Sequence, residues 1–385
     1  MTAARPAPPD AVRGVLASGP RLQGVDVARA LALLGMIGTH VGGIADTVDW
    51  SAPDTWAAVA HGRSSSLFAV LAGVSIGLTS GRSRPSGPPT IGRVRARLAI
   101  RAAAVVAVGL LLMALDTPVY VILPTYGVLF VLVVPVLRWR ARWLLVLAAA
   151  CAVLSPVAAL AIAPAYADAG TWEVQLGLVY PVVTFLAYVL VGLAVARLPA
   201  RRVDATRAPS DGLEARRTQV ALLAAGTLVA VVAYGAGNLL APLPDDAVFA
   251  FPGVPYAPAG ATPADALMQV FLSPRDHSSS IVDVVGTTGV AVAVIGLCCL
   301  LVDGRGRTAS RIALPLAAVG SMPLSVYALH LVVIAALPAY PDSGAAWAWF
   351  AIGSVLFAVV WRTVLGRGPL ERLLARLTGL VPIAR

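Results

Sequence analysis

Ten apolar segments, each close to the length that crosses a lipid bilayer, are the feature that most constrains how this chain can fold. A bilayer core of about 30 Å needs roughly 20 apolar residues in a helix. The sequence therefore predicts an all-α, polytopic integral membrane protein with about ten transmembrane helices. The segments lie near residues 26–45, 64–80, 97–115, 119–137, 143–163, 178–196, 218–239, 283–302, 313–338 and 346–365.

The composition agrees with a membrane protein. Of the 385 residues, 58% are hydrophobic and 12% are charged, whereas a soluble domain carries about 25% charged residues. The net charge is +10, but the arginines that produce it fall in short clusters between the apolar segments. This distribution favours membrane lipids with anionic headgroups as the partner of these arginines, and not nucleic acid.

The loops between the segments alternate in charge, and this alternation predicts the orientation. Arg-rich loops follow the second, fourth, sixth and eighth segments, while the other loops are acidic or poor in arginine. The positive-inside rule places the Arg-rich loops and both termini on the cytoplasmic side. We therefore expect a multi-pass protein of the cell membrane. No apolar core precedes residue 25, so we expect the first helix to direct insertion without a cleaved signal peptide.

The loop lengths predict one transmembrane body with two tails. The outer loop at 240–282 is long enough to act as a lid or binding element, and its PADALMQVFL segment favours a short interfacial helix. The expected divisions are an N-terminal cytoplasmic tail (1–25), a body (26–365) made of six helices (26–196), a cytoplasmic linker (197–217) and four helices (218–365), and a C-terminal cytoplasmic tail (366–385).

The first segment carries the most informative polar residues. Arg29 and His40 are eleven residues apart, which at about 100° per residue puts them on nearly the same helix face with a rise of about 16 Å. An anionic substrate held by Arg29 could present its reactive end to His40, because histidine transfers protons near neutral pH. The alternative is structural, with Arg29 as a snorkelling, lipid-facing anchor and His40 as a hydrogen-bonded residue of helix packing. Asp26 is interpreted as a cap or ion-pair partner of Arg29.

Several motifs resemble the transmembrane acyltransferase superfamily. Asp26, Arg29 and His40 match the first-helix pattern of the acyltransferase-3 family, and FAVLAGVS at 68–75 is similar to its second-helix signature. RVRARLAIR at 93–101 resembles the Arg-rich segment that leads into its third helix. Other segments look closer to YeiB-like bacterial membrane proteins and to relatives of heparan-α-glucosaminide N-acetyltransferase: RLQGVDVARALALLGMI, YGVLF, YPVVTFLAYVLVGLAVARL, GSMPLSVYALH and RGPLERLLARL.

The resemblance implies that the chain transfers an acyl group, usually acetyl, from cytoplasmic acyl-CoA (acetyl-CoA). The acceptor would be a hydroxyl or amine of an extracytoplasmic glycan or lipid, and no metal is implied. Guanidinium groups suit the phosphates of CoA, although ordinary positive-inside loop charges explain the same arginines. The candidate donor-binding residues are Arg29, Arg93, Arg95, Arg97 and Arg101.

The resemblance points to more than one catalytic histidine. The acyltransferase-3 pattern points to His40, whereas the N-acetyltransferase pattern points to the connection after the first helix, where His61 is nearest but differently spaced. His277 is a third candidate, and His330 is interpreted as structural. The candidate acceptor-binding residues are Arg63, Asp276 and Asp283.

Two other functions remain open from the residues. A transporter or lipid permease would have the same polytopic pattern and intramembrane polar groups. A non-catalytic membrane partner protein would show the same pattern. The three cysteines show neither metal spacing nor a disulfide framework. The sequence leaves the oligomeric state open, a homo-oligomer included.

Overall fold

The structure is a computed structural model that describes residues 22–45, 48–49, 51–162, 179–199, 212–242 and 262–382. Every regular element in these ranges is a helix, so the all-α prediction is confirmed there. The predicted linker residues 200–211, most of the outer loop (243–261) and residues 1–21 of the N-terminal tail lie outside the described residues.

The described helices follow the predicted segments closely, since each of the ten segments contains a helix. In chain order they are α1 (Gln23–Val41), α2 (Arg63–Thr79), α3 (Pro88–Met113), α4 (Leu123–Leu132), α5 (Ala141–Ile162), α7 (Val182–Ala196), α8 (Arg216–Leu240), α9 (Pro263–Leu272), α10 (Ile281–Val302), α11 (Gly306–Ser321), α12 (Pro323–Ala336), α13 (Gly344–Val364) and α14 (Pro369–Gly379), with 3-10 helices η2 (Pro53–Ala60) and η5 (Gly212–Glu214).

The lengths of these helices identify a multi-pass membrane protein. Among the described residues, six helices are long and apolar enough to cross a bilayer, or seven if α11 and α12 count as one bent span. Two further apolar helices, α4 and α7, are shorter. Helices can cross a bilayer because a helix satisfies its own backbone hydrogen bonds in lipid.

Prolines explain where the structure departs from the predicted segments. The segment predicted at 119–137 is helical only over Leu123–Leu132, and Pro124 stands in its first turn. The prediction of one continuous helix at 313–338 is wrong, because α11 and α12 meet at a bend of 70°. Pro323 begins α12, and proline has no backbone N–H with which to continue the preceding helix.

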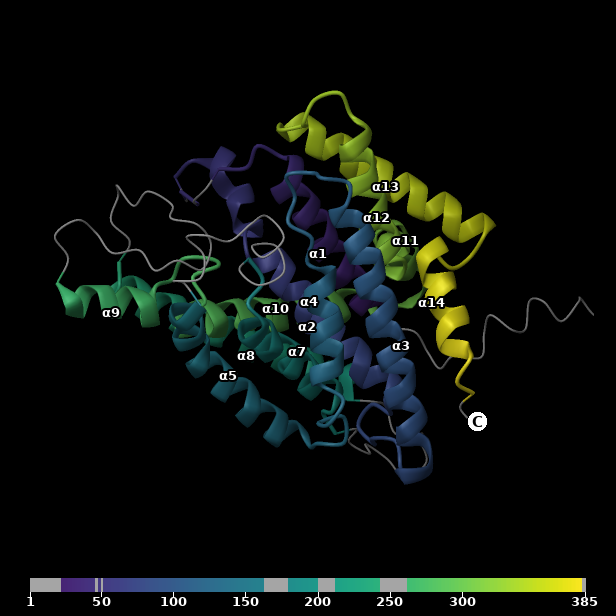
Figure 1. Ribbon diagram of the computed structural model, residues 1–385, viewed down its shortest axis with the longest axis horizontal. Coiled ribbons are helices and arrows are strands. Elements are labelled where there is room, and N and C mark those ends of the chain that lie inside the picture. Colours follow the sequence, from purple (N-terminus) through teal and green to yellow (C-terminus); the bar gives the residue numbers. More distant parts are fainter. Residues whose placement is uncertain are drawn as a thin grey trace, which may run out of the picture.

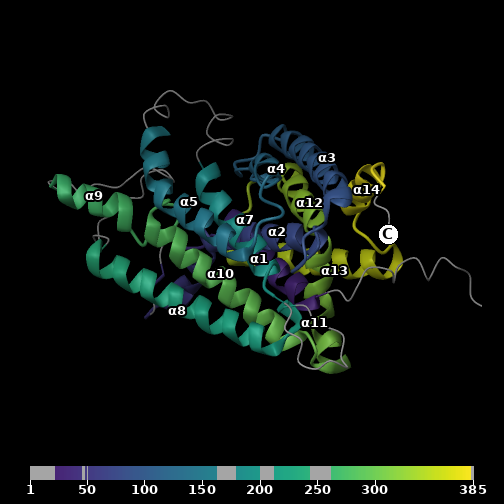
Figure 2. The same ribbon diagram turned by 90° about the horizontal axis from the view of Figure 1, so that it is seen from below.

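The bundle is arranged around α1. Figure 1 shows α1 near the centre, with α5, α7, α8 and α10 on one side and α11 to α14 on the other, and the view in Figure 2 shows the same division. The most extensive pairings are α8 with α10, α2 with α7, and α5 with α7, followed by α1 with α11. Of the six long helices, α1 is the most buried, so its polar residues lie inside protein and not in lipid.

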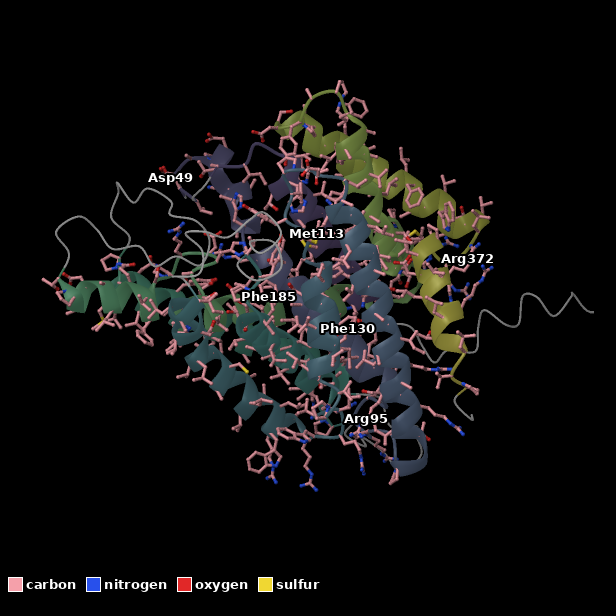
Figure 3. All side chains as sticks on the ribbon, viewed as in Figure 1. Asp49, Arg95, Met113, Phe130, Phe185 and Arg372 are labelled. Atoms are coloured by element: carbon pink, nitrogen blue, oxygen red, sulfur yellow. The ribbon has the colours of Figure 1, made fainter. Side chains whose placement is uncertain are left out.

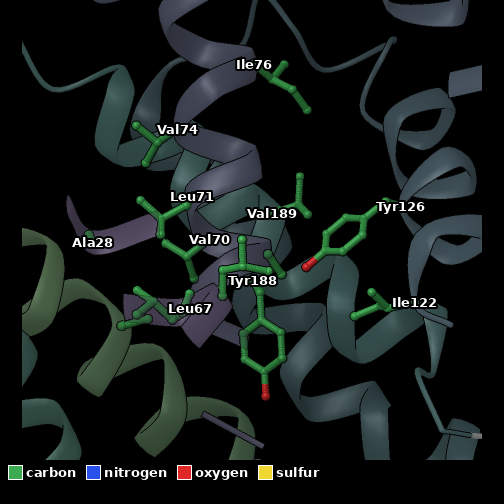
Figure 4. Packing of buried hydrophobic residues seen from close by; sticks show 14 of the residues in the cluster. Ala28, Leu67, Val70, Leu71, Val74, Ile76, Ile122, Tyr126, Tyr188 and Val189 are labelled. Atoms are coloured by element: carbon green, nitrogen blue, oxygen red, sulfur yellow. The ribbon is translucent and has the colours of Figure 1, made fainter. Parts of the chain in front are cut away.

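Close backbone contact joins α2 to α7. Figure 4 shows Val70 and Leu71 of α2 packed beside Val189 of α7 in the apolar core. A Cβ atom at Gly192 would lie 1.8 Å from the carbonyl oxygen of Val70, so only glycine permits this approach. Small residues at such crossings are typical of helix packing in membranes.

Residues from an Arg-rich segment and from an acidic predicted loop lie at different ends of the bundle (Figure 3). Figure 3 shows Arg95 near the lower end and Asp49 near the upper end.

The C-terminal segment predicted as a tail contains the helix α14, which packs against α3 and α12. The short helix predicted in the PADALMQVFL segment is present as α9.

Arg197, at the end of α7, forms hydrogen bonds with several neighbouring segments. Its guanidinium donates to the carbonyl oxygens of Gly77 at 3.2 Å and Leu137 at 2.7 Å and to the Oγ of Ser80 at 2.7 Å. It also donates to the carbonyl oxygen of Arg82. One buried side chain thus links α7 to the end of α2 and to the turn after α4.

Replacement of Arg197 by alanine should destabilise the protein, because several buried acceptors would lose their donor. The expected loss is about 1–3 kcal/mol, measured as thermal unfolding of the purified protein in detergent. Arg217→Ala is the matched control, since Arg217 is exposed. Equal unfolding temperatures for the two variants would contradict a structural role of Arg197.

Candidate functional site

A cavity of ≈ 250 Å³ lies in the centre of the bundle beside α1. Its wall comes from α1, α2, α3, α4, α12 and α14, with Ser321 added from the end of α11. Most of the lining is apolar, and its charged members are Arg29, Arg101 and Glu371. Tyr126 and Tyr327 add two hydroxyl groups. The cavity is therefore an apolar slot with a few polar groups, the usual form of a ligand site.

Arg29 is held in this wall by three neighbours. Its Nη1 donates to Asp26 Oδ1 at 2.7 Å and to the carbonyl oxygen of Gly320 at 2.8 Å. Its Nη2 donates to Ser75 Oγ at 3.0 Å. The expected Asp26–Arg29 ion pair is confirmed. Because the guanidinium is fixed among α1, α2 and α11, Arg29 is not a lipid-facing anchor.

A close approach of α11 to α1 makes this arrangement possible. A Cβ atom at Gly320 would lie 1.7 Å from the carbonyl oxygen of Asp26. Gly320 thus lets α11 lie directly against the turn of α1 that carries Asp26 and Arg29. Its own carbonyl oxygen then faces the guanidinium.

Arg101 joins the central cavity to a second one. A cavity of ≈ 160 Å³ is lined by Arg97 and Thr378, and Ile76 and Arg101 line both cavities. The Arg101 guanidinium packs over the ring of Phe130 at 5.7 Å, and its buried Nε has no hydrogen-bond partner among the described residues. A buried cationic donor without a partner fits an anionic ligand.

The other candidate arginines lie elsewhere on α3. The helix begins at Pro88, so the Arg-rich segment is helical and not a loop. Arg97 and Arg101 are four residues apart and share a face, and both line a cavity. Arg93 is exposed, and neither it nor Arg95 lines either of these cavities.

His40 and His330 form a pair next to the end of the central cavity that Met36 and Tyr327 line. His40 Nδ1 lies 3.1 Å from His330 Nε2, and the rings stack with centroids 5.3 Å apart. The Tyr327 ring meets the His330 ring edge-on at 5.0 Å. Met36 and Tyr327 line the cavity, about one helical turn before the two histidines. The pair therefore lies at the cavity's end away from Arg97.

Sequence reasoning treated His330 as structural and missed this pair. The two histidines are 290 residues apart in the chain, so no local spacing indicates their contact. The signal that could have found His330 is the GSMPLSVYALH segment, which also supplies Pro323, Leu324 and Tyr327 of the cavity wall.

The structure brings His61 and His277 together in a second polar group. A Cβ atom at Gly62 would lie 3.0 Å from Asp276 Cβ and 3.5 Å from His277 Cδ2. The buried His61 Nε2 has no hydrogen-bond partner among the described side chains and backbone. Burial lowers the pKa of His277 in the loop before α10, while Asp276 partly opposes this shift. A neutral imidazole that can accept a proton is therefore favoured at neutral pH.

Arg63 and Asp283 complete this second group. The Arg63 guanidinium lies over the Tyr234 ring at 5.1 Å from its centroid. The Tyr234 hydroxyl pairs with Thr287 Oγ1 at 2.8 Å, and Thr287 donates to Asp283 Oδ1 at 3.1 Å. Asp283 also accepts from the Ser279 amide at 3.3 Å. These contacts fix the positions of Arg63 and Asp283, two of the three candidate acceptor-binding residues.

Among the residues that the structure describes, no group of three His, Cys, Asp or Glu side chains is arranged to hold a metal ion.

The family model for heparan-α-glucosaminide N-acetyltransferase, catalytic, matches residues 21–234. This match covers more than half of the 385 residues. The chain belongs to this family. No curated protein matches the chain.

The heparan-α-glucosaminide N-acetyltransferase match covers only part of the site. It contains Arg29, His40 and His61, together with the arginines of α3. His277, His330 and Glu371 come from the chain beyond residue 234. The described site thus joins the matched helices to α10, α12 and α14.

Gly320→Ala should destabilise the protein, because the added methyl group would force α11 away from α1. The expected cost is about 1–3 kcal/mol, measured by thermal unfolding in detergent. Gly353→Ala on α13 is the control, since a Cβ there meets nothing within 4 Å. That control should be neutral or stabilising. If Gly320→Ala behaves like the control, the close contact between α1 and α11 is wrong.

Proposed function

We propose that the chain is a membrane-embedded acyltransferase that moves an acyl group, with acetyl as the first candidate, from cytoplasmic acyl-CoA to an extracytoplasmic acceptor. The acceptor group is a hydroxyl or amine of a glycan or lipid. Membership of the family supports a transferase. The observation that carries the proposal is the pair of adjoining cavities, which extend from Arg97 and Arg101 to Met36 and Tyr327, about one helical turn from the His40–His330 pair.

The donor site lies on the side of the proposed cytoplasm. Arg97 and Arg101 bind CoA phosphates, because guanidinium groups form charge-assisted hydrogen bonds with them. The two cavities measure ≈ 250 and ≈ 160 Å³, whereas a pocket for a whole drug-sized ligand has about 300–1,000 Å³. They therefore suit the narrow pantetheine arm, and the nucleotide stays outside them at the inner mouth.

His40 is the first candidate for the base. When its Nδ1–H donates to His330 Nε2, its Nε2 carries a free lone pair, which is the usual way a partner fixes a histidine tautomer. His40 takes the acceptor's proton as the acceptor's oxygen or nitrogen bonds to the thioester carbon. The carbon–sulfur bond then breaks, and the imidazolium returns the proton to the CoA thiolate.

His61 and His277 supply the second candidate for the same role. His61 Nε2 has no partner among the described residues, and Asp276 and His277 pack against the adjoining Gly62, which suits the binding of a polar acceptor. In this version Arg63, Asp276 and Asp283 bind the acceptor. The covalent route, with an acyl-histidine intermediate, predicts ping-pong kinetics, whereas direct transfer does not.

The proposal includes the predicted topology. Ten transmembrane helices, counted with α2, α4, α7 and the bent pair α11–α12, return both termini to the cytoplasmic side of the cell membrane. The arginine clusters at one end of the bundle contact anionic lipid headgroups there. In this orientation Arg97 and Arg101 lie near the inner side, and all four histidines lie nearer the outer side.

The proposal predicts thioester turnover by the purified protein with acetyl-CoA and an extract of cell-surface glycans and lipids. His40→Ala should lower kcat by about 10²–10⁴-fold. Arg101→Ala should raise the KM for acetyl-CoA about tenfold or more through loss of a charge-assisted contact. Arg93→Ala is the matched control on the same helix, and its KM should not change.

Three outcomes would contradict parts of this proposal. Full activity of His40→Ala with loss of activity in His61→Ala would move the base to His61. Equal effects of Arg101→Ala and Arg93→Ala would remove the donor site from the cavity. Absence of turnover, with no thermal stabilisation by acetyl-CoA, would contradict the enzyme and leave a transporter as the better function.

A further inference from the structure

The N-termini of α12 and α14 meet at two side chains that cap each other's helices. Glu371 Oε1 accepts from the backbone N–H of Leu324 at 2.8 Å and of Ser325 at 3.3 Å. The Ser325 hydroxyl donates to Glu371 Oε2. The same hydroxyl accepts from the backbone N–H of Leu370 at 3.1 Å. One carboxylate and one hydroxyl thus accept from two N–H groups in the first turn of α12 and one in the first turn of α14.

The first turn of α12 depends on such caps. The first N–H groups of a helix have no partner within the helix, and the sharp bend before Pro323 removes α11 as a source of acceptors. A carboxylate at a helix N-terminus also interacts favourably with the helix dipole. Glu371 therefore caps the N-terminus of α12, although it lies in another helix and 47 residues away in the chain.

α12 carries two groups of the proposed site. Tyr327 lines the central cavity, and His330 pairs with His40. His330 is six residues after Leu324, a distance of about 9 Å along the helix. Because α12 has only 14 residues and begins at a bend, a shift of its N-terminus would also move His330.

α14 reaches the donor end of the site as well. Leu374 lines the central cavity and Thr378 the second cavity. Just beyond α14, the carbonyl oxygen of Val381 accepts from Arg97 Nε at 2.8 Å. The C-terminal helix thus contacts the arginine proposed for CoA and the helix that carries His330.

We infer that Glu371 is a positioning residue for acyl transfer, and that it acts by holding the N-terminus of α12 so that His330 meets His40. This role rests on the proposed function. Glu371 also faces Arg29 and Arg101 across the cavity, so its charge could act on the arginines directly. A glutamine at this position separates the two roles, because its amide oxygen still accepts from the N–H groups of Leu324 and Ser325 but carries no charge.

The test compares Glu371→Ala, Glu371→Gln and Ser325→Ala in thioester turnover. Glu371→Ala should lower kcat about 10- to 100-fold, because small displacements of a catalytic group have effects of this size, with the KM for acetyl-CoA changed much less. Glu371→Gln should retain most of the activity. The double variant of Glu371→Ala and Ser325→Ala should be no worse than the poorer single variant, since both remove one shared contact. Arg376→Ala, on the exposed side of α14, is the control.

A second measurement reports the geometry without activity. In a protein with His40→Cys and His330→Cys, a short bifunctional thiol reagent should join the two positions. Addition of Glu371→Ala should lower the yield severalfold, while Glu371→Gln and Arg376→Ala should not. This readout stands even if the protein proves not to be an acyltransferase, so failure of the function and failure of the positioning role are distinguishable.

Three results would overturn the inference. They are an unchanged kcat and cross-linking yield in Glu371→Ala, a glutamine variant as impaired as the alanine variant, and independent effects of Glu371 and Ser325 that add in the double variant. If Glu371→Ala does not fold, as judged by thermal unfolding in detergent, the glutamine variant and Ser325→Ala decide the question with the same two readouts.

Discussion

The Arg29 guanidinium and its three partners are the interaction on which the rest of the structure depends. A charged side chain inside a membrane bundle is costly unless it is paired, and here Asp26, Gly320 and Ser75 supply the partners. These contacts join α1 to α2 and α11. They also place a cation in the wall of the central cavity, so the same interaction stabilises the bundle and shapes its site.

The bend between α11 and α12 has the second large effect. Because α11 ends at Ser321 and α12 starts anew at Pro323, the carbonyl oxygen of Gly320 is available to Arg29 and the N–H groups of α12 are available to Glu371. A straight helix would use these groups internally. The bend therefore frees backbone groups for two side chains of the cavity wall, which is a common use of interrupted helices in membrane proteins.

The sequence predicted the helices well, because length and hydropathy are local properties. It also predicted the ion pair of Asp26 and Arg29, whose three-residue spacing lies within one helix. It could not predict the contact of His40 with His330 or the cap that Glu371 provides, since these partners are far apart in the chain. The bend at Pro323 was missed because a proline in an apolar run often leaves a membrane helix continuous.

The motifs behind the family resemblance gain a common place in the structure. The segments FAVLAGVS, YGVLF, GSMPLSVYALH and RGPLERLLARL all line the central cavity, through residues such as Ser75, Tyr126, Tyr327 and Glu371. No single segment indicates a cavity, because each is short and mostly apolar. Their convergence depends on packing between α2, α4, α12 and α14.

The central claim is one continuous site between the basic cavity and the histidine pair. The most direct test is an experimental structure of the protein with a non-hydrolysable thioether analogue of acetyl-CoA. The account predicts phosphate density at Arg97 and Arg101, and a pantetheine arm that passes Tyr126 and Tyr327 to bring its sulfur next to His40. Density for the analogue outside this cavity, or with its sulfur far from both His40 and His61, would contradict the account.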